Sequence, residues 1–177
     1  MEKLYLQLII PMKTIKNLKK GALEMATLLA QDDVVKKLLV IDDKDALQEE
    51  TPSYDLNKLL EEHYISIYPP VENRIEEYDR NTFLSILLNT ITGQDNQTGN
   101  YIIYVSTDTA HIALSNNQDR LLELVDKVCL ILEGAKLTSA GEISITTIAY
   151  QSLSDLHPAY RISVHIKDQQ SSPKGDL

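Results

Sequence analysis

The sequence predicts an α+β protein in which helices pack on one face of an antiparallel sheet. Apolar residues recur at helical spacing in the first half of the chain and again around residue 125, whereas alternating apolar and polar residues mark strands in the second half. Hydrophobic residues make up 43% and charged residues 24% of the 177 residues, as in folded globular proteins. We predict one domain over residues 1–168, followed by a polar C-terminal tail over residues 169–177.

Strand and helix signals alternate in the first half of the chain. Pro11 ends the first apolar alternation, Asp32 or Asp33 is placed to cap a helix, and Ser53 can cap another. The elements predicted here are a strand over 4–10, a helix over 15–29, a short helix over 32–39, a short helix from 53 toward 63, and a short strand over 64–68.

The second half begins with a predicted helix and then alternates strands with one further helix. Ser115 and Gln118 form a capping-box pattern, and Gly134 is placed to end the helix that follows. The elements predicted here are a helix over 74–91, strands over 101–105 and 109–114, a helix over 118–133, and strands over 143–149 and 160–166.

Acidic residues concentrate in one third of the chain. Residues 1–30 carry five lysines and two glutamates, whereas residues 31–79 carry fourteen acids and five bases, a net charge of −9. Residues 80–177 carry ten acids and seven bases. A negative field of this kind repels nucleic acid and anionic membranes and attracts a basic protein. The alternative is a solvated acidic surface that aids solubility.

The possible metal ligands and nucleophiles do not cluster in the sequence. None of the four histidines, His63, His111, His157 and His165, lies three or four residues from another, so no tightly bound transition metal is expected. His111 and His165 both fall on predicted strands and could be neighbours across the sheet. Cys129, the only cysteine, falls on an apolar helix stripe, which predicts a buried and unreactive thiol.

No catalytic constellation and no cofactor site is identified in the sequence. The chain has no GxSxG motif and no glycine-rich phosphate loop. Many acids occur as adjacent pairs, such as Glu61 and Glu62, whose side chains point in different directions and are usually solvated. We therefore assign no residue a catalytic role.

Cysteine content and hydropathy predict a cytoplasmic protein. A single cysteine excludes an intrachain disulfide and favours a reducing compartment. The apolar run over residues 4–10 is short and lacks the cleavage site of a signal peptide. No stretch has the roughly 20 consecutive apolar residues of a membrane-spanning helix, so no membrane association is expected.

The aromatic composition is unusual, with nine tyrosines, one phenylalanine and no tryptophan. Tyrosine is a frequent interface anchor, although it can also replace phenylalanine at half-buried core edges. We predict that a basic protein binds the acidic third of the chain through steering carboxylates and tyrosine anchors. The predicted partner-binding residues are Glu49, Glu50, Tyr54, Glu61, Glu62, Tyr64, Tyr68, Glu76, Glu77 and Tyr78.

The order of strand, amphipathic helix, acidic loop, sheet and helix resembles that of small bacterial immunity proteins, which neutralise polymorphic or contact-dependent toxins. The stretch Leu23 to Asp33, LEMATLLAQDD, is similar to the helix after the first strand in one such family. This resemblance implies a non-enzymatic inhibitor that binds a cognate toxin.

The sequence leaves three hypotheses for function. The first is an acidic immunity protein that occludes the active site of a basic toxin domain. The second is a small-molecule enzyme whose site is assembled from dispersed residues, lined by His111 or His165 beside a carboxylate with a shifted pKa. The third is an accessory subunit whose apolar faces are covered in an oligomer. The sequence does not set the oligomeric state.

Overall fold

A computed structural model describes residues 12–67, 81–92 and 98–167. The helices are α1 (Met12–Gln31), α2 (Asp33–Val40), α3 (Leu56–Glu61) and α4 (Arg120–Leu132). The strands are β1 (Ile65–Ser66), β2 (Thr82–Thr92), β3 (Thr98–Thr107), β4 (Lys136–Leu137), β5 (Gly141–Tyr150) and β6 (Ala159–Lys167), and Thr109–His111 form a 3-10 turn after β3. The predicted strand over residues 4–10 and the polar tail over 169–177 lie outside the described residues.

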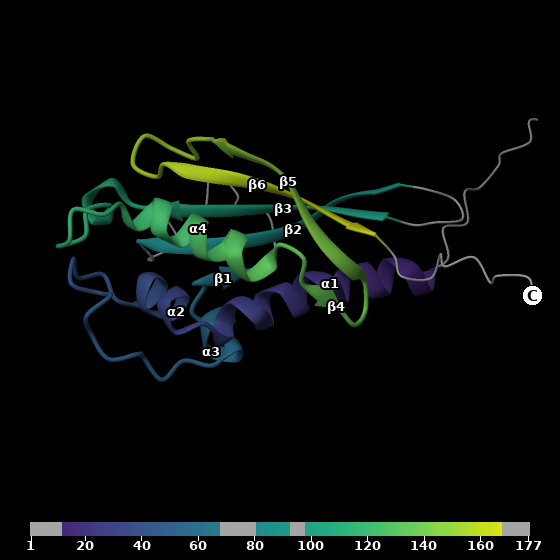
Figure 1. Ribbon diagram of the computed structural model, residues 1–177, viewed down its shortest axis with the longest axis horizontal. Coiled ribbons are helices and arrows are strands. Elements are labelled where there is room, and N and C mark those ends of the chain that lie inside the picture. The colour runs from purple at the N-terminus through teal and green to yellow at the C-terminus, as the bar shows by residue number, and fades with distance from the viewer. Residues whose placement is uncertain (1–11, 68–80, 93–97, 168–177) are drawn as a thin grey trace, which may run out of the picture.

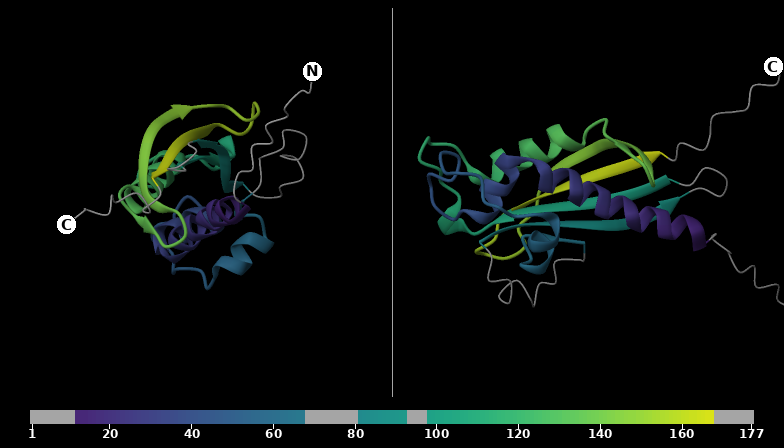
Figure 2. Two further views of the ribbon diagram at one scale, coloured as in Figure 1. Left: turned by 90° about the vertical axis from the view of Figure 1, so that its right-hand side faces the viewer. Right: turned by 90° about the horizontal axis from the view of Figure 1, so that it is seen from below.

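The described strands form one curled sheet in the order β1-β2-β3-β6-β5-β4 (Figure 1). β1 pairs with β2 in parallel, and all other pairs are antiparallel. Seen from its end, the sheet arches over the helices (Figure 2, left). The predicted α+β class, with helices on one face of a mainly antiparallel sheet, is therefore confirmed.

The core lies between the concave face of the sheet and helices α1, α2 and α4. Alternate residues of the central strands enter it, as Ile103 of β3 and Ile162 and Val164 of β6 show by their full burial. The predicted inward and outward alternation of β6 is thus confirmed. The helices contribute a matching apolar layer, of which the largest fully buried members are Met25, Leu29, Leu38, Leu39 and Leu124.

Carboxylate side chains cap helices α2, α3 and α4. Asp32 accepts a 2.9 Å hydrogen bond from the Val35 amide and caps α2, as predicted. The cap of α3 is Asp55 rather than Ser53, and α4 begins after Asp119 rather than at Gln118. A charged acceptor interacts with the positive end of the helix dipole more strongly than a hydroxyl does, which explains both corrections.

The predicted helix over 74–91 is wrong for its described part, because Thr82–Thr92 form strand β2. Leu84 and Ile86 enter the core, but Phe83 and Ser85, which point to the other face, are buried as well. A strand buried on both faces lacks polar alternation, so its pattern cannot be distinguished from that of a buried helix.

The predicted strand over 109–114 is also wrong, because the chain turns there instead of pairing along its length. Asp108 accepts a 2.7 Å hydrogen bond from the Ala110 amide and starts the 3-10 turn. Ala113 forms only an isolated bridge with Asp119. The two-residue strand β4 was not predicted, since a segment so short carries no periodicity.

Arg120 is fully buried at the start of α4 and binds four backbone carbonyls. Its Nε donates to His111 (2.9 Å), Nη1 to Leu38 (2.9 Å) and Ile41 (2.6 Å), and Nη2 to Asp43 (2.6 Å). Burial lowers the pKa of the guanidinium, while the nearby carboxylates of Asp42 and Asp43 raise it. One side chain therefore joins the end of α2, the loop after it, the 3-10 turn and α4.

Cys129 of α4 is half-buried rather than fully buried, and the neighbouring apolar side chain of Leu122 is exposed. Burial raises the pKa of the Cys129 thiol, and the negative charges of Asp126 and Glu133 raise it further. The reactive thiolate is therefore scarce at neutral pH.

We predict that Arg120→Met destabilises the fold by about 3–5 kcal/mol, because it leaves four carbonyls without their donor. Arg120→Lys should be intermediate, since an ammonium cannot reproduce the fork geometry of a guanidinium. Urea unfolding of each variant tests this, with Lys127→Met on the same helix as the control. A loss within 1 kcal/mol of the control would show that the carbonyls find other partners.

We further predict that Cys129 reacts slowly with thiol reagents in the native protein and rapidly after unfolding. The matched control is Leu130→Cys in a Cys129→Ser background, because position 130 is 75% exposed on the same helix. The native rates of the two thiols are compared by absorbance with a chromogenic disulfide. Equal native rates would contradict the protection inferred for Cys129.

Candidate protein-binding surface

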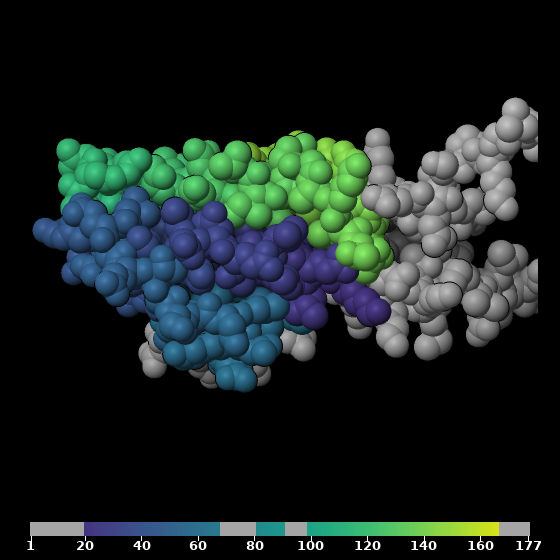
Figure 3. All heavy atoms as spheres, turned by 60° about the horizontal axis from the view of Figure 1, so that its bottom comes forward, coloured from purple at the N-terminus to yellow at the C-terminus, as the bar shows by residue number. Residues whose placement is uncertain are grey.

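Residues 31–67 form a continuous surface made of α2, the loop after it, α3 and β1, drawn blue to blue-green in Figure 3. These residues include ten acids and four lysines, a net charge of −6. We call this the acidic surface. It covers the described part of the segment that the sequence marks as a partner-binding region.

Three of the four lysines on the acidic surface are engaged locally. Lys36 pairs with Asp33 at 2.9 Å, and the Lys37 ammonium donates to the Leu47 carbonyl at 3.3 Å. Lys58 lies 3.8 Å above the centre of the Tyr54 ring. These contacts leave the net charge of −6 unchanged, but they hold three of the ammonium groups against the protein's own atoms.

Most of the charged groups on the acidic surface that a partner can reach are carboxylates. Glu49, Glu50 and Glu61 are exposed and form no ion pair within the part of the chain that the structure describes. Exposed charges of one sign attract a partner of the other sign at a distance. The acidic surface therefore favours basic partners.

Tyr54 is held in place at the centre of this surface. Its ring meets the Tyr64 ring edge to face, with centroids 5.8 Å apart and planes at 82°. Its hydroxyl donates a 3.2 Å hydrogen bond to Glu62 Oε2, and Lys58 lies over its face. A half-buried aromatic ring fixed by three neighbours loses little conformational entropy when a partner covers it.

A hollow of about 450 Å³, open to solvent, lies beside α3. It is lined by polar and charged residues: Ser53, Asp55, Asn57, Lys58, Glu61 and Glu62. Three carboxylates around one lysine make this hollow suited to a cationic side chain such as arginine or lysine. Asp55 and Asn57 were not among the predicted binding residues, although their closeness in sequence to Glu61 and Glu62 was a signal for them.

The structure brings together only part of the predicted site. Tyr54, Glu61 and Glu62 gather around α3, and Glu49 and Glu50 are exposed on the loop before it. Tyr64 is only 7% exposed and packs in the core, where its ring contacts the Tyr54 ring. It therefore supports Tyr54 and is not itself exposed to a partner. The remaining predicted residues, Tyr68, Glu76, Glu77 and Tyr78, lie outside the described residues.

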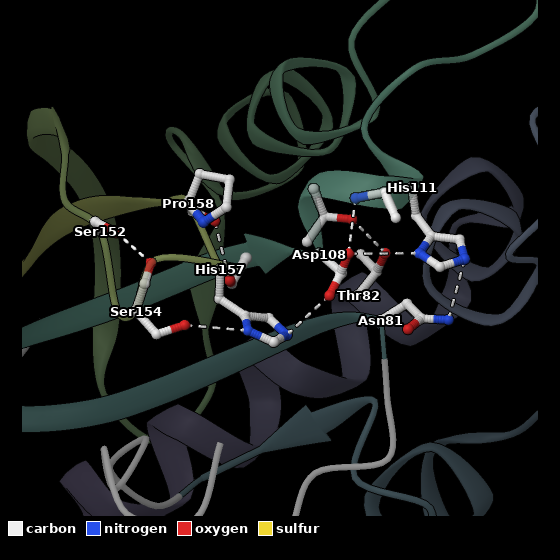
Figure 4. A network of polar contacts seen from close by, with 11 residues as sticks. Asn81, Thr82, Asp108, His111, Ser152, Ser154, His157 and Pro158 are labelled. Carbon is white, nitrogen blue, oxygen red and sulfur yellow. Dashed lines mark hydrogen bonds and ion pairs between the residues drawn. The ribbon is translucent and has the colours of Figure 1, made fainter. Parts of the chain in front are cut away.

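A second polar cluster lies where β3 turns toward the loop between β5 and β6 (Figure 4). Asp108 stands between two imidazoles, with Oδ1 3.9 Å from His111 Nδ1 and Oδ2 4.0 Å from His157 Nε2. Ser154 Oγ lies 3.3 Å from His157 Nδ1, and Asn81 Nδ2 lies 3.4 Å from His111 Nε2. Serine, histidine and aspartate thus meet here from two segments, the turn after β3 and the loop between β5 and β6, and Asn81 comes from a third.

The contacts of this cluster around Asp108, which we call the Asp108 corner, are those of a structural junction between segments. The distances of 3.9 and 4.0 Å from Asp108 to the imidazoles exceed hydrogen-bonding range, and Asp108 Oδ1 already accepts from the Ala110 amide. Two backbone-directed bonds join the same segments, from the Thr109 amide to the Leu156 carbonyl (2.9 Å) and from Ser106 Oγ to the Pro158 carbonyl (3.0 Å). The corner therefore anchors the β5–β6 loop to the end of β3.

The histidines do not assemble as the sequence suggested. His111 lies in the 3-10 turn and not on a strand, while His165 lies near the opposite end of β3, where its Nδ1 is 2.8 Å from Asn100 Oδ1. The expectation that His111 and His165 are neighbours is thus wrong. Within the described ranges, no group of three or more His, Cys, Asp or Glu side chains is arranged to hold a metal ion.

None of the helices in the described ranges is both long and apolar enough to span a membrane. Comparison of the chain with models of protein families and with curated proteins finds no match. The candidate site therefore stands on its own geometry, which is that of a negatively charged surface with one immobilised tyrosine.

Proposed function

We propose that this chain is a non-enzymatic binding protein that neutralises a basic partner, namely an immunity protein that occludes the active site of a cognate bacterial toxin. The observation that carries the proposal is the acidic surface, on which Glu49, Glu50 and Glu61 are exposed and three of four lysines are engaged locally. The resemblance of Leu23 to Asp33 to immunity proteins supports the choice of partner class.

The proposed mechanism has two physical stages. The carboxylates of the acidic surface attract the basic partner and orient it during approach, which raises the association rate. Cationic side chains of the partner then enter the hollow beside α3, and an apolar part of the partner covers Tyr54. Blocking follows because the partner's basic surface, which would bind its own anionic substrate, is occupied.

The decisive experiment uses the protein encoded directly upstream of this chain's gene as the candidate toxin. Its C-terminal domain is expressed in a bacterial host with and without this chain, and growth is measured. Protection, together with a one-to-one complex of the purified proteins, is the expected result. Growth arrest despite abundant folded chain, or no complex, would overturn the proposal.

Variants at the Asp108 corner separate this proposal from an enzymatic function. Asp108→Asn and His157→Ala should leave protection unchanged, because the corner lies outside the acidic surface. Loss of protection with intact complex formation would instead indicate that the chain acts by chemistry.

We predict that Glu49→Lys combined with Glu61→Lys lowers the association rate for the toxin domain by about tenfold or more and flattens its salt dependence. The matched control is Glu142→Lys combined with Asp155→Lys, which makes the same charge change at exposed positions outside the acidic surface. Stopped-flow or surface-based kinetics at two salt concentrations measure both. Equal rates for the two double variants would show that total charge alone matters and that the acidic surface is only solvated.

We also predict that Tyr54→Ala raises the dissociation rate, costing about 2 kcal/mol of binding free energy if the ring is an anchor. Tyr54→Phe removes only the hydroxyl that donates to Glu62 and should cost far less. Dissociation rates of the two variants are compared, with thermal unfolding as a check on the fold. Wild-type dissociation from Tyr54→Ala would exclude Tyr54 as an anchor.

A further inference from the structure

One edge of the sheet is left open along the second half of β5. β4 covers only Gly141 and Glu142. Beyond them, Ile143 exchanges backbone hydrogen bonds with Gly134 and Ala135, and the Ile145 amide donates to Glu133. From Thr147 to Tyr150, no described residue pairs with β5 on the side away from β6.

The register shows which groups are unpaired on this edge. The Gln151 amide donates a 2.8 Å hydrogen bond to the Ala159 carbonyl, so the backbone groups of Gln151 point toward β6. Because this direction alternates along a strand, the backbone groups of Ala149 also point toward β6. The N–H and C=O groups of Ile148 and Tyr150 therefore point outward from the sheet. They form a short template for another strand.

The side chains of this edge are uncharged, and those of Ile148 and Tyr150 are large and exposed. Ile148 is 48% and Tyr150 63% exposed, and the Tyr150 ring is held edge to face against Tyr160 at 5.7 Å. No charged residue occurs from residue 143 to residue 154, in a chain of net charge −9. Natural edge strands usually carry lysine, proline, an inward charge or a β-bulge that hinders pairing. Residues 147–150 have no lysine, proline or charge, and the register shift of β5 between Ile145 and Thr147 lies before them.

We propose that the open edge of β5 pairs with the same edge of a second copy, antiparallel about a two-fold axis at Ala149, to form a homodimer with one continuous sheet. In this register Ile148 of each copy lies opposite Tyr150 of the other. The two pairs each exchange two N–H···O=C bonds. Each also places an aliphatic side chain against an aromatic one, a stabilising cross-strand contact.

Charge and space both favour a second copy as the occupant. On the two-fold axis, Ala149 of one copy lies opposite Ala149 of the other as a non-hydrogen-bonded pair. The side chains of such a pair lie close together, and the small alanine side chain fits in this space. The neutral edge lies at the β5 side of the sheet, whereas the acidic surface adjoins β1 and α3 at the other side (Figure 2, left). Pairing therefore keeps the two negative surfaces apart, and the inference does not rest on the proposed function.

Sedimentation velocity from low micromolar to several hundred micromolar protein tests the dimer. We expect the wild type to be dimeric at the upper end and Ile148→Lys to be monomeric throughout, because the change places a lysine ammonium opposite the Tyr150 ring in both pairs and adds a positive charge on either side of the axis. Leu130→Lys, the same change at an exposed leucine of α4, should leave the dimer intact. A wild type that stays monomeric, or an Ile148→Lys variant that dimerises as the wild type does, would overturn the proposal.

Two further variants test the register and stay informative if Ile148→Lys unfolds. Adding Tyr150→Glu to Ile148→Lys places opposite charges across both pairs and should restore a dimer that weakens in salt. In a Cys129→Ser background, Ala149→Cys should form an intermolecular disulfide far faster than Thr147→Cys, since only position 149 faces itself across the axis. Equal cross-linking at the two positions would exclude this pairing.

Discussion

The buried guanidinium of Arg120 is the interaction on which the rest of this structure depends. Its four carbonyl partners belong to the end of α2, the following loop and the 3-10 turn, and the side chain itself starts α4. A charge in this position is tolerated because each of the three guanidinium nitrogens donates to a backbone carbonyl and because α2 presents the negative end of its dipole. The end of α2 and the loop after it are thereby fixed to the 3-10 turn and α4, which are distant from them in sequence.

The acidic surface follows from that constraint. Since the carbonyls of Ile41 and Asp43 face the guanidinium, the carboxylates of Asp42 and Asp43 are left exposed on the outside of the loop. They still stabilise the positive charge, as their effect on the pKa of Arg120 shows. The loop thus presents negative charge to solvent while two of its carbonyls are held by Arg120, and exposed charge of one sign is what steers a partner of the other sign.

Elements with one buried face could be predicted from the sequence, whereas contacts between segments could not. α1, α2, β5 and β6 were found because their apolar residues follow one period, and β2 was missed because Phe83 and Ser85 are buried behind it. An arginine beside an apolar stripe is normally solvated, so nothing in the sequence indicated the role of Arg120. Likewise, only the structure shows that Tyr64 is in the core and that Tyr54 is the ring available to a partner.

One edge of the sheet lies beside a charged surface and the other edge is neutral, so binding of a basic partner and pairing of two copies would use different parts of the molecule. Near β1 the surface is charged, so its contacts gain from long-range attraction and weaken as salt screens them. At β5 the strand is neutral over residues 143–154, so contacts there rest on backbone hydrogen bonds and apolar burial, which are not weakened by the screening of charges. A chain of net charge −9 can therefore associate with itself at β5 while its acidic surface near β1 stays open to a basic partner.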